Sequence, residues 1–302
     1  MDVTAALRAF IRCIERGSIT AAARDLGVSQ PAISKLIRNL EGHTGARLLE
    51  RSSRAVRPTP IGLALYEASG TSLAAIDAAL ESARRDMGEI KGKLRVHGPV
   101  CLGESHLHRI VADFQRLYPG VSIDLTLENR AIDLVHENVD VAVRIGRPAE
   151  QSYILRKMGL IKRILVAAPD YLARHGAIRS PASLASHSVL VTDAVLSRQG
   201  AITLVGRGQS ATIQIDPVLK TNNARVLIAA LLGGQGLGPV QLPLVSDELA
   251  SGRLVRVLPQ YEVRPSELYI VYPTARFLRP VVRSFIDHAG PALKKIEGIV
   301  QA

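Results

Sequence analysis

Residues 18–41, SITAAARDLGVSQPAISKLIRNLE, decide the fold of the N-terminal part of this chain. They predict two short helices joined by a tight turn. Ser18 and Ser29 are each placed to cap a helix, and Gly27 lies where the first helix must end, because glycine reaches a positive φ at little cost. Behind each cap, apolar residues recur at the i, i+3, i+4, i+7 spacing of a buried helical face.

A third amphipathic helix precedes this pair, with apolar residues at the same spacing: Leu7, Phe10, Ile11 and Ile14. Three such helices can close a small core and leave the second helix of the pair free to enter the major groove of DNA. A generic helical hairpin is the alternative, but turn, caps and polar face together favour a helix-turn-helix. Gln30, Ser34 and Arg38 are expected to reach base edges. The full set of candidate DNA contacts on this helix is Ser29, Gln30, Pro31, Ser34, Lys35 and Arg38.

The segment that follows, residues 48–57, predicts a short β-hairpin rich in arginine. Such a wing would lie along the DNA backbone or enter the minor groove. It adds Arg51, Arg54 and Arg57 to the candidate contacts, and Lys35, Arg51 and Arg54 are expected mainly on phosphates. We therefore expect a winged helix-turn-helix domain over residues 1–58.

Length and composition indicate what accompanies this domain. At 302 residues the chain needs at least two domains, and its formal net charge of +11 favours a polyanionic partner. No apolar run reaches transmembrane length and the N-terminus lacks a signal-peptide core, so no membrane partner is expected. The two cysteines, Cys13 and Cys101, cannot build a disulfide framework, and a cytoplasmic location is expected.

Residues 59–88 predict one long linker helix. Thr59 and Pro60 read as its cap and first residue. A 3-4 spacing over three heptads predicts a seam that pairs with the same helix of a second subunit. A helix packed on its own domain is the alternative. The seam residues are Tyr66, Ser69, Leu73, Ile76, Leu80, Ala83 and Met87, and residues 89–93 read as a hinge.

Residues 94–302 predict an α/β effector domain with a mostly parallel sheet. We expect one subdomain from about 94–163 and 268–302, and another from about 164–267. The first should contain a helix with Leu107 to Leu117 on its buried face and another helix over 131–138. The expected strands are 94–97, 121–127, 139–145, 164–167, 189–192, 202–205, 211–215 and 268–271, and the further helices are 170–175, 224–232 and 280–289.

The cleft between these subdomains is the expected ligand site. Val100, Cys101 and Leu102 follow the first strand and approach a helix N-terminus, where free N–H groups favour a carboxylate. Arg144 ends another strand and either adds positive charge or serves as a structural ion-pair partner. A small anionic or aromatic acid is therefore expected. The second subdomain adds Thr192 and Asp193, and the expected crossing back between subdomains adds Thr221, Asn222 and Asn223.

Other chemical signals are weaker. The glycine run at 233–238 follows a helix and precedes a strand, which is the wrong order for a nucleotide loop. His106 and His108 are two apart on a predicted helix, so solvated histidines are expected rather than a metal site. Cys101 reads as a small pocket residue, with a redox sensor as the alternative. No catalytic motif or cofactor site is found, so an α/β enzyme or solute-binding protein carrying a DNA-binding appendage is only the competing hypothesis.

Several short stretches along the chain match one known family: VSQPAIS at 28–34, GARLLER at 45–51, YPGV at 118–121, DVAVRIG at 140–146 and ASGRL at 250–254. Over residues 1 to about 290, the chain therefore resembles the LysR-type transcriptional regulators. The resemblance implies a sequence-specific regulator of transcription that binds double-stranded DNA as a homodimer or tetramer. It also implies that residues 94–302 form a periplasmic-binding-protein-like domain that senses a small molecule.

Overall fold

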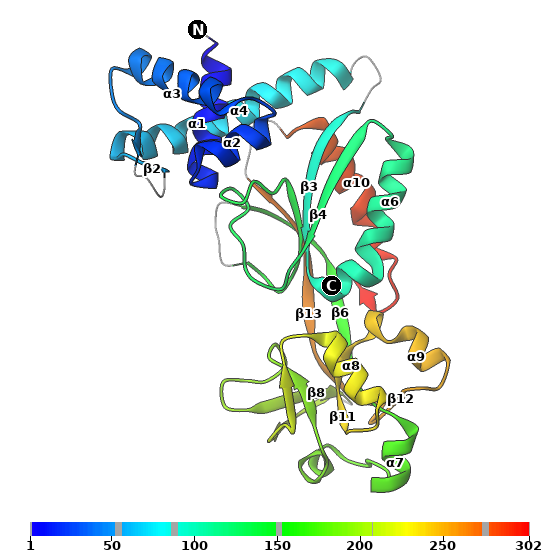
Figure 1. The fold of residues 1–302 in the computed structure, drawn as a ribbon. Helices are drawn as coiled ribbons and strands as arrows, with labels where there is room; N and C mark the ends of the chain where they lie inside the picture. The colour runs from blue at the N-terminus through cyan, green and yellow to red at the C-terminus, as the bar shows by residue number, and fades with distance from the viewer. Residues whose placement is uncertain are drawn as a thin grey trace. The chain divides into compact units, whose positions relative to one another are not determined.

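The computed structural model describes residues 2–51, 56–85, 90–148, 153–206, 208–273 and 278–301 (Figure 1). The chain forms two compact units. The first is drawn from residues 1–91, 135–138 and 274–283, and the second from residues 92–134, 139–273 and 284–302.

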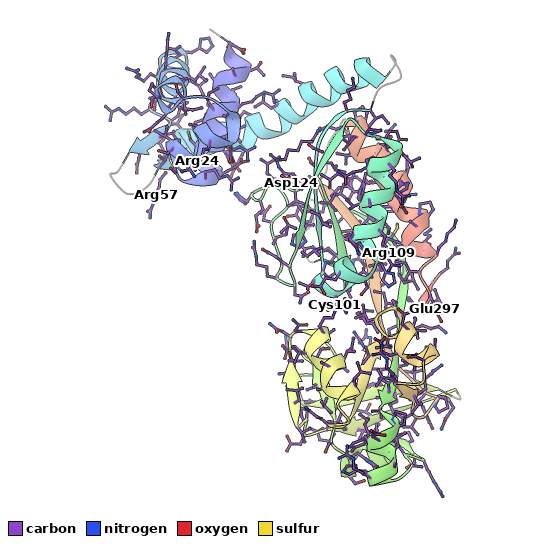
Figure 2. All side chains as sticks on the ribbon, turned by 45° about the vertical axis from the view of Figure 1, so that its right-hand side comes forward. Arg24, Arg57, Cys101, Arg109, Asp124 and Glu297 are labelled. Carbon is purple, nitrogen blue, oxygen red and sulfur yellow. The ribbon has the colours of Figure 1, made fainter. Side chains whose placement is uncertain are left out.

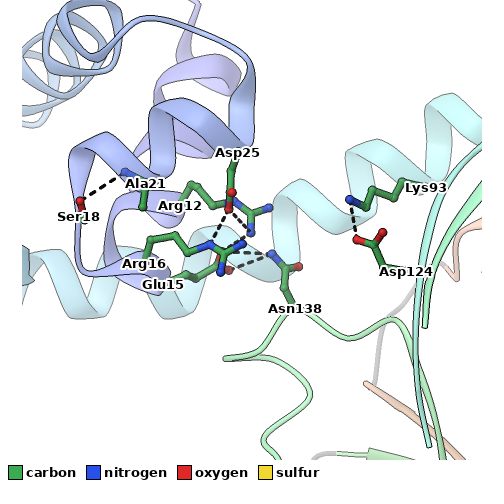
Figure 3. Close-up of polar contacts among 9 residues, drawn as sticks. All are labelled: Arg12, Glu15, Arg16, Ser18, Ala21, Asp25, Lys93, Asp124 and Asn138. Atoms are coloured by element: carbon green, nitrogen blue, oxygen red, sulfur yellow. Dashed lines mark hydrogen bonds and ion pairs between the residues drawn. The ribbon is translucent and has the colours of Figure 1, made fainter. Parts of the chain in front are cut away.

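The first unit contains the predicted helix pair with its predicted caps. Ser18 Oγ accepts from the Ala21 N–H at 3.3 Å (Figure 3), and Ser29 Oγ accepts from the Ala32 N–H at 3.3 Å. Gly27 ends the first helix of the pair with a φ of 65°. The elements in order are α1 (Val3–Arg16), α2 (Ile19–Leu26), α3 (Gln30–Thr44), β1 (Leu49–Arg51), β2 (Val56–Pro58) and α4 (Pro60–Arg85).

The core of this unit lies among α1, α2, α3 and the start of α4. Ala22 and Ala23 are buried and small, so α1 can approach α2 closely. An ion pair between Arg16 Nε and Asp25 Oδ2, at 2.5 Å, also joins these two helices (Figure 3). The largest fully buried side chains of the cluster are Phe10, Ile33, Ile37, Leu40 and Leu48.

The long helix α4 starts as predicted, because the Gly62 N–H donates to Thr59 Oγ1 at 3.0 Å. Tyr66, Ser69 and Leu73 of the predicted seam are buried, whereas Ile76 is 45% exposed. The side chains of Leu80 and Ala83, and all of Met87, lie outside the described part of the chain. Pairing of this seam with a second subunit stays a prediction.

The second unit is built on a mixed sheet with the strand order β11-β6-β13-β5-β3-β4. The mostly parallel sheet that we expected is not found: along this strand order only β3 pairs parallel, with β4 and β5, whereas β13, β6 and β11 pair antiparallel. These strands are β3 (Gly92–Gly98), β4 (Val121–Leu127), β5 (Val141–Ile145), β6 (Tyr153–Ala167), β11 (Leu237–Gln241) and β13 (Glu262–Pro273). Residues 190–192 and 219–221 form a separate parallel pair of short strands. Since β3 begins at Gly92, the last two residues of the predicted hinge are strand.

Two lobes make up this unit, and β6 and β13 run through both (Figure 1). The first lobe carries β3, β4 and β5 with α6 (His108–Leu117) and α10 (Pro280–Lys294), whose Phe114 and Phe285 rings meet edge to face. The second lobe holds α7 (Pro169–His175), β7 (Leu190–Thr192), β8 (Ala201–Gly206), β9 (Gln209–Gln214), β10 (Leu219–Thr221), α8 (Ala224–Leu232), α9 (Ser246–Ala250) and β12 (Val255–Arg256). The short strand β14 (Ile299–Val300) pairs with β6.

The sequence predicted only the last four residues of β6 (164–167) and an inner part of β13 (268–271), and it placed the crossing near Thr221–Asn223. That placement is wrong: Thr221 ends β10, which pairs with β7 in the second lobe, and Asn223 caps α8. The first half of β6 was missed because exposed charged residues such as Arg156 and Lys157 interrupt its apolar pattern. Strand length was therefore underestimated where the chain passes between lobes.

Two predicted helices of the first lobe also differ. Residues 131–138 form extended chain and turns, and Asn138 has a φ of 58°, which cannot continue a helix. The helix after Pro99 is divided into α5 (Val100–Leu102), the wider π-type turn η1 (Gly103–Leu107) and α6. Leu117, expected on the buried face, is 61% exposed because it is the last residue of α6, where the chain leaves the helix. Among the described residues, no helix is long and apolar enough to cross a membrane.

Candidate DNA-binding surface and effector pocket

The polar face of α3 is presented to solvent as the sequence predicts. Ser29, Gln30, Pro31, Lys35 and Arg38 are exposed, and Ser34 is half-buried. Arg38 Nε donates to the Ser34 carbonyl at 3.3 Å, so this arginine is extended along the helix. Contact of these residues with DNA stays a prediction.

The wing follows α3 as an antiparallel hairpin. Glu50 of β1 lies opposite Arg57 of β2, and Arg57 is exposed. Arg51 lies opposite Val56, but its side chain and the whole of Arg54 are outside the described part of the chain.

A clamp that sequence reasoning missed holds the base of the wing to α3 and α4. Glu41 Oε1 accepts from the Leu48 N–H at 2.9 Å and from the Leu49 N–H at 3.3 Å. The Thr59 N–H donates to the Leu48 carbonyl at 3.0 Å, and this carbonyl packs against Gly62. A single acidic residue near the end of a helix whose polar face is otherwise basic was the available signal. The clamp fixes the wing relative to the recognition helix.

The second unit contains a pocket of about 410 Å³, within the usual size range of small-molecule sites. It receives side chains from both lobes, and Cys101 lies at the end of the first lobe that faces the second (Figure 2). Six of the predicted ligand contacts line it: Cys101, Leu102, Arg144, Thr192, Asp193 and Asn222.

Three predicted contacts do not line this pocket. The Val100 N–H, expected to be free for a ligand, instead donates to Asn129 Oδ1 at 3.1 Å. Thr221 Oγ1 accepts from the Asn223 N–H at 3.1 Å, and Asn223 Oδ1 accepts from the Arg225 N–H at 2.8 Å. These polar groups shape the start of α8 rather than the pocket wall.

Polar contacts join the two lobes around the pocket. Arg225 Nε of α8 pairs with Glu104 Oε2 at 3.0 Å, and Asn129 Nδ2 donates to the Asn222 carbonyl at 3.4 Å. His106, expected to be solvated, is part-buried with Nε2 3.0 Å from the Pro243 carbonyl. His108 Nδ1 is 3.3 Å from the Gly103 carbonyl. Within the described ranges, no group of three His, Cys, Asp or Glu side chains is placed to hold a metal ion.

Cys101 has the environment of a packed thiol. It is buried, and burial raises the pKa of its thiol, against the opposing effect of the Arg225 and Ala224 N–H groups. Burial therefore opposes ionisation of this thiol, which counts against the redox-sensor alternative and favours the interpretation as a small pocket residue.

Arg163 is a pocket residue that sequence reasoning missed. Its side chain lines the pocket and is 5% exposed, with Nη1 donating to the Arg264 carbonyl at 3.1 Å and Nη2 donating to Ser266 Oγ at 3.0 Å. Burial lowers the pKa of its guanidinium. The signal was an arginine next to Lys162, directly before the apolar run 164–167.

Known protein families match both units. Residues 4–63 match the family described as "Bacterial regulatory helix-turn-helix protein, lysR family", and residues 87–294 match "LysR substrate binding domain". The chain belongs to the LysR family of transcriptional regulators. Members of this family bind DNA operators and small-molecule effectors and form oligomers.

Individual relatives agree with this assignment. The chain is 33% identical over 281 residues to the HTH-type transcriptional regulator PtxR of Pseudomonas aeruginosa, covering 93% of this chain and 90% of PtxR. It is 29% identical to the HTH-type transcriptional activator AaeR of Escherichia coli, over 87% of this chain and 85% of AaeR.

Solved structures match over nearly the whole chain. The full-length virulence activator AphB of Vibrio cholerae is 25% identical, with a TM-score of 0.61 over 97% of this chain and 99% of that one. CrgA of Neisseria meningitidis, a LysR-type transcriptional regulator, is 24% identical with a TM-score of 0.60 over 97% of this chain and 98% of that one, which supports the fold alone.

Proposed function

We propose that this LysR-family chain is a sequence-specific DNA-binding regulator whose affinity for its operator is set by a small molecule in the 410 Å³ pocket. The observation that carries the proposal is the pairing of an exposed recognition helix in one unit with a two-lobed pocket in the other. A regulator of this kind acts where the chromosome is, so we assign it to the cytoplasm.

In this proposal α3 lies in the major groove and the wing follows the backbone. Gln30, Ser34 and Arg38 contact base edges, and the remaining candidates contact phosphates or position the helix. Pairing of two α4 helices would present two recognition helices to successive major grooves. The operator is then an imperfect inverted repeat, with half-sites one helical turn or a multiple of it apart.

Removing a base contact should lower operator affinity and relax specificity at one position. For Gln30→Ala and Arg38→Ala we expect losses of about 1–3 kcal/mol each. Lys35→Ala should instead weaken binding to all DNA sequences alike and make the affinity less dependent on salt concentration. Footprinting and fluorescence anisotropy at several salt concentrations measure both effects.

Arg109→Ala is the matched control, because Arg109 is an exposed arginine of α6 in the other unit. It removes the same charge from the chain without altering α3. Unchanged operator affinity in both Gln30→Ala and Arg38→Ala would show that this face of α3 does not read the DNA.

The effector is proposed to bind between the two lobes and to change how they close. A ligand shifts a conformational equilibrium only through its differential affinity for the two states, and contacts to both lobes provide that difference. Thr192 and Asp193 approach from the second lobe, and Cys101 and Arg144 approach from the first.

Filling the pocket should abolish effector binding. We expect that an organic acid found to bind the full-length chain by calorimetry will bind Cys101→Phe at least about tenfold more weakly, because the ring occupies the ligand volume. Cys101→Ser, which adds no volume, should bind nearly as the parent does. An acid that binds Cys101→Phe as tightly as the parent would place the effector site elsewhere.

A further inference from the structure

Arg163 is a buried cation without a counter-ion in the described part of the chain. Its guanidinium donates to a carbonyl and a hydroxyl, and it forms no ion pair with any described carboxylate. An arginine stays charged in proteins, and a buried charge is costly unless it is paired. The site therefore has a place for an anion.

The acidic residues of the pocket do not supply that anion. Glu128 Oε2 pairs with Arg130 Nε at 2.5 Å, and Asp193 Oδ1 pairs with Lys220 Nζ at 3.1 Å. Neither of these two cations lines the pocket. Both pocket carboxylates are thus engaged by cations outside the pocket, and neither pairs with Arg163. The guanidinium of Arg144, the other arginine of the pocket, donates to the Arg130 carbonyl at 3.1 Å and to the Ile132 carbonyl at 3.4 Å.

Arg163 also lies on a strand that connects the two lobes, beside a register shift. It lies in β6 between Gln241 of β11 and Val263 of β13, and the register between β6 and β13 shifts between Val263 and Ser266. Its guanidinium bridges this irregularity through the Arg264 carbonyl and Ser266 Oγ. Since β6 and β13 run through both lobes, a group bound to Arg163 contacts the strands that connect the lobes.

The other walls of the pocket limit the rest of the ligand. Apolar side chains from both lobes face it: Leu102, Val143, Leu227, Val240 and Leu244. One buried guanidinium beside such walls suits a molecule with one carboxylate and an apolar body. A carboxylate can accept two parallel N–H donors from arginine, which a neutral amide cannot match.

We propose that Arg163 is the residue that recognises charge in this pocket, binding the carboxylate of a monocarboxylic acid with an apolar body. The inference rests on the proposed effector function and names its ligand class and anchoring residue. Binding draws the guanidinium toward the ligand and loosens its hold on Arg264 and Ser266, which links occupancy of the pocket to the crossing strands. The competing role for Arg163 is a purely structural bridge between β6 and β13.

The first test compares acids with their primary amides on the full-length chain. Benzoate and hexanoate are the probes, and benzamide and hexanamide are neutral controls of the same shape. We expect at least one acid to raise the melting temperature of the chain and to bind measurably by calorimetry. The corresponding amide should bind at least about tenfold more weakly, because it cannot form the charged hydrogen bonds with the guanidinium. No response to either acid, or equal responses to acid and amide, would overturn the proposal.

The second test removes the guanidinium. Arg163→Gln should weaken binding of the responding acid by a factor on the order of 10 to 100 while leaving the amide unchanged. Arg163→Lys keeps the charge but not the planar guanidinium, so its affinity for the acid should lie between those of the parent and Arg163→Gln. This variant preserves the test if Arg163→Gln does not fold. Arg264→Gln is the matched control, because its side chain is exposed and does not line the pocket.

The outcomes separate this inference from the proposed function. If Cys101→Phe abolishes binding of the acid and Arg163→Gln leaves it intact, the pocket binds the effector and Arg163 is only a structural bridge. If neither variant changes binding, the pocket itself has been misassigned and both proposals fail. If Cys101→Phe and Arg163→Gln both lose binding of the acid while Arg264→Gln keeps it, the proposed function and the role of Arg163 are both supported.

Discussion

Gly62→Ala should unfold the N-terminal domain at a markedly lower temperature than the parent chain. A Cβ built on Gly62 would lie 2.0 Å from the Leu48 carbonyl oxygen and 2.9 Å from the Leu48 carbonyl carbon. Both are backbone atoms, so no side-chain rotation relieves the overlap. We expect a loss of about 3 kcal/mol or more, at the upper end for overpacked sites, because the backbone at Leu48 must move.

The displaced carbonyl belongs to the clamp at the base of the wing. It accepts from the Thr59 N–H at 3.0 Å, and the adjoining N–H groups of Leu48 and Leu49 donate to Glu41. Moving this segment strains all of these bonds together. Operator affinity should therefore fall in Gly62→Ala even below the temperature at which the domain unfolds.

Gly42→Ala is the matched control for this variant. Gly42 lies inside α3, nothing is within 4 Å of a Cβ built on it, and it has no positive φ. Alanine should therefore stabilise the helix there by about 0.5–1 kcal/mol. Scanning calorimetry of the full-length chain follows the transition of the N-terminal domain in both variants. An equal unfolding temperature of the N-terminal domain in Gly62→Ala and the parent would show that the backbone at Leu48 moves without a loss of stability.

The first unit was predictable because its determinants are local. Caps at Ser18 and Ser29, the turn at Gly27 and a 3.6-residue apolar period each fix a few neighbouring residues, and the structure confirms them. The clamp through Glu41 was not predictable in this way, since it joins residues seven and eight positions apart whose spacing matches no local motif.

The second unit was less predictable because its strands obtain their stability from distant partners. Residues 153–163 carry exposed charges and no clear period, yet they form strand since β13, far along the chain, pairs with them. Conversely, residues 131–138 have an acceptable helical pattern, but burial of Ile132 and Leu134 against β5 and β13 residues holds them extended or in turns. Tertiary pairing decided both outcomes over local pattern.

The pocket residues also divide into those that the sequence could predict and those that it could not. Residues that directly follow a strand, such as Cys101 and Thr192, were found by the rule that ligands bind beyond strand ends. Arg163 was not, because it lies within a strand and lines the pocket only because β6 pairs with β13 and runs from one lobe into the other. No sequence rule locates a crossing point before the sheet order is known.

If two subunits pair through α4 as we propose, Ile76→Lys should dissociate them without unfolding either chain. Ile76 is a large apolar residue that is 45% exposed in the single chain, on the seam that continues from buried Tyr66, Ser69 and Leu73. Because it is exposed within one chain, a charge there does not disturb that chain's own packing. In a symmetric pair of α4 helices two lysines would be buried without partners, which should weaken dimerisation by about 100-fold or more.

The consequence for DNA binding follows from linkage of the two recognition helices. A dimer binds its second half-site at a high effective concentration, so dissociation should lower operator affinity by a factor on the order of 10² to 10⁴ while single half-site affinity is retained. Ala64→Lys is the control, since Ala64 is exposed on the same helix away from the seam. Sedimentation measures assembly, and anisotropy with full and half operators measures binding. An intact dimer in Ile76→Lys would show that α4 uses a different face, because a charge buried in the seam cannot be accommodated without loss.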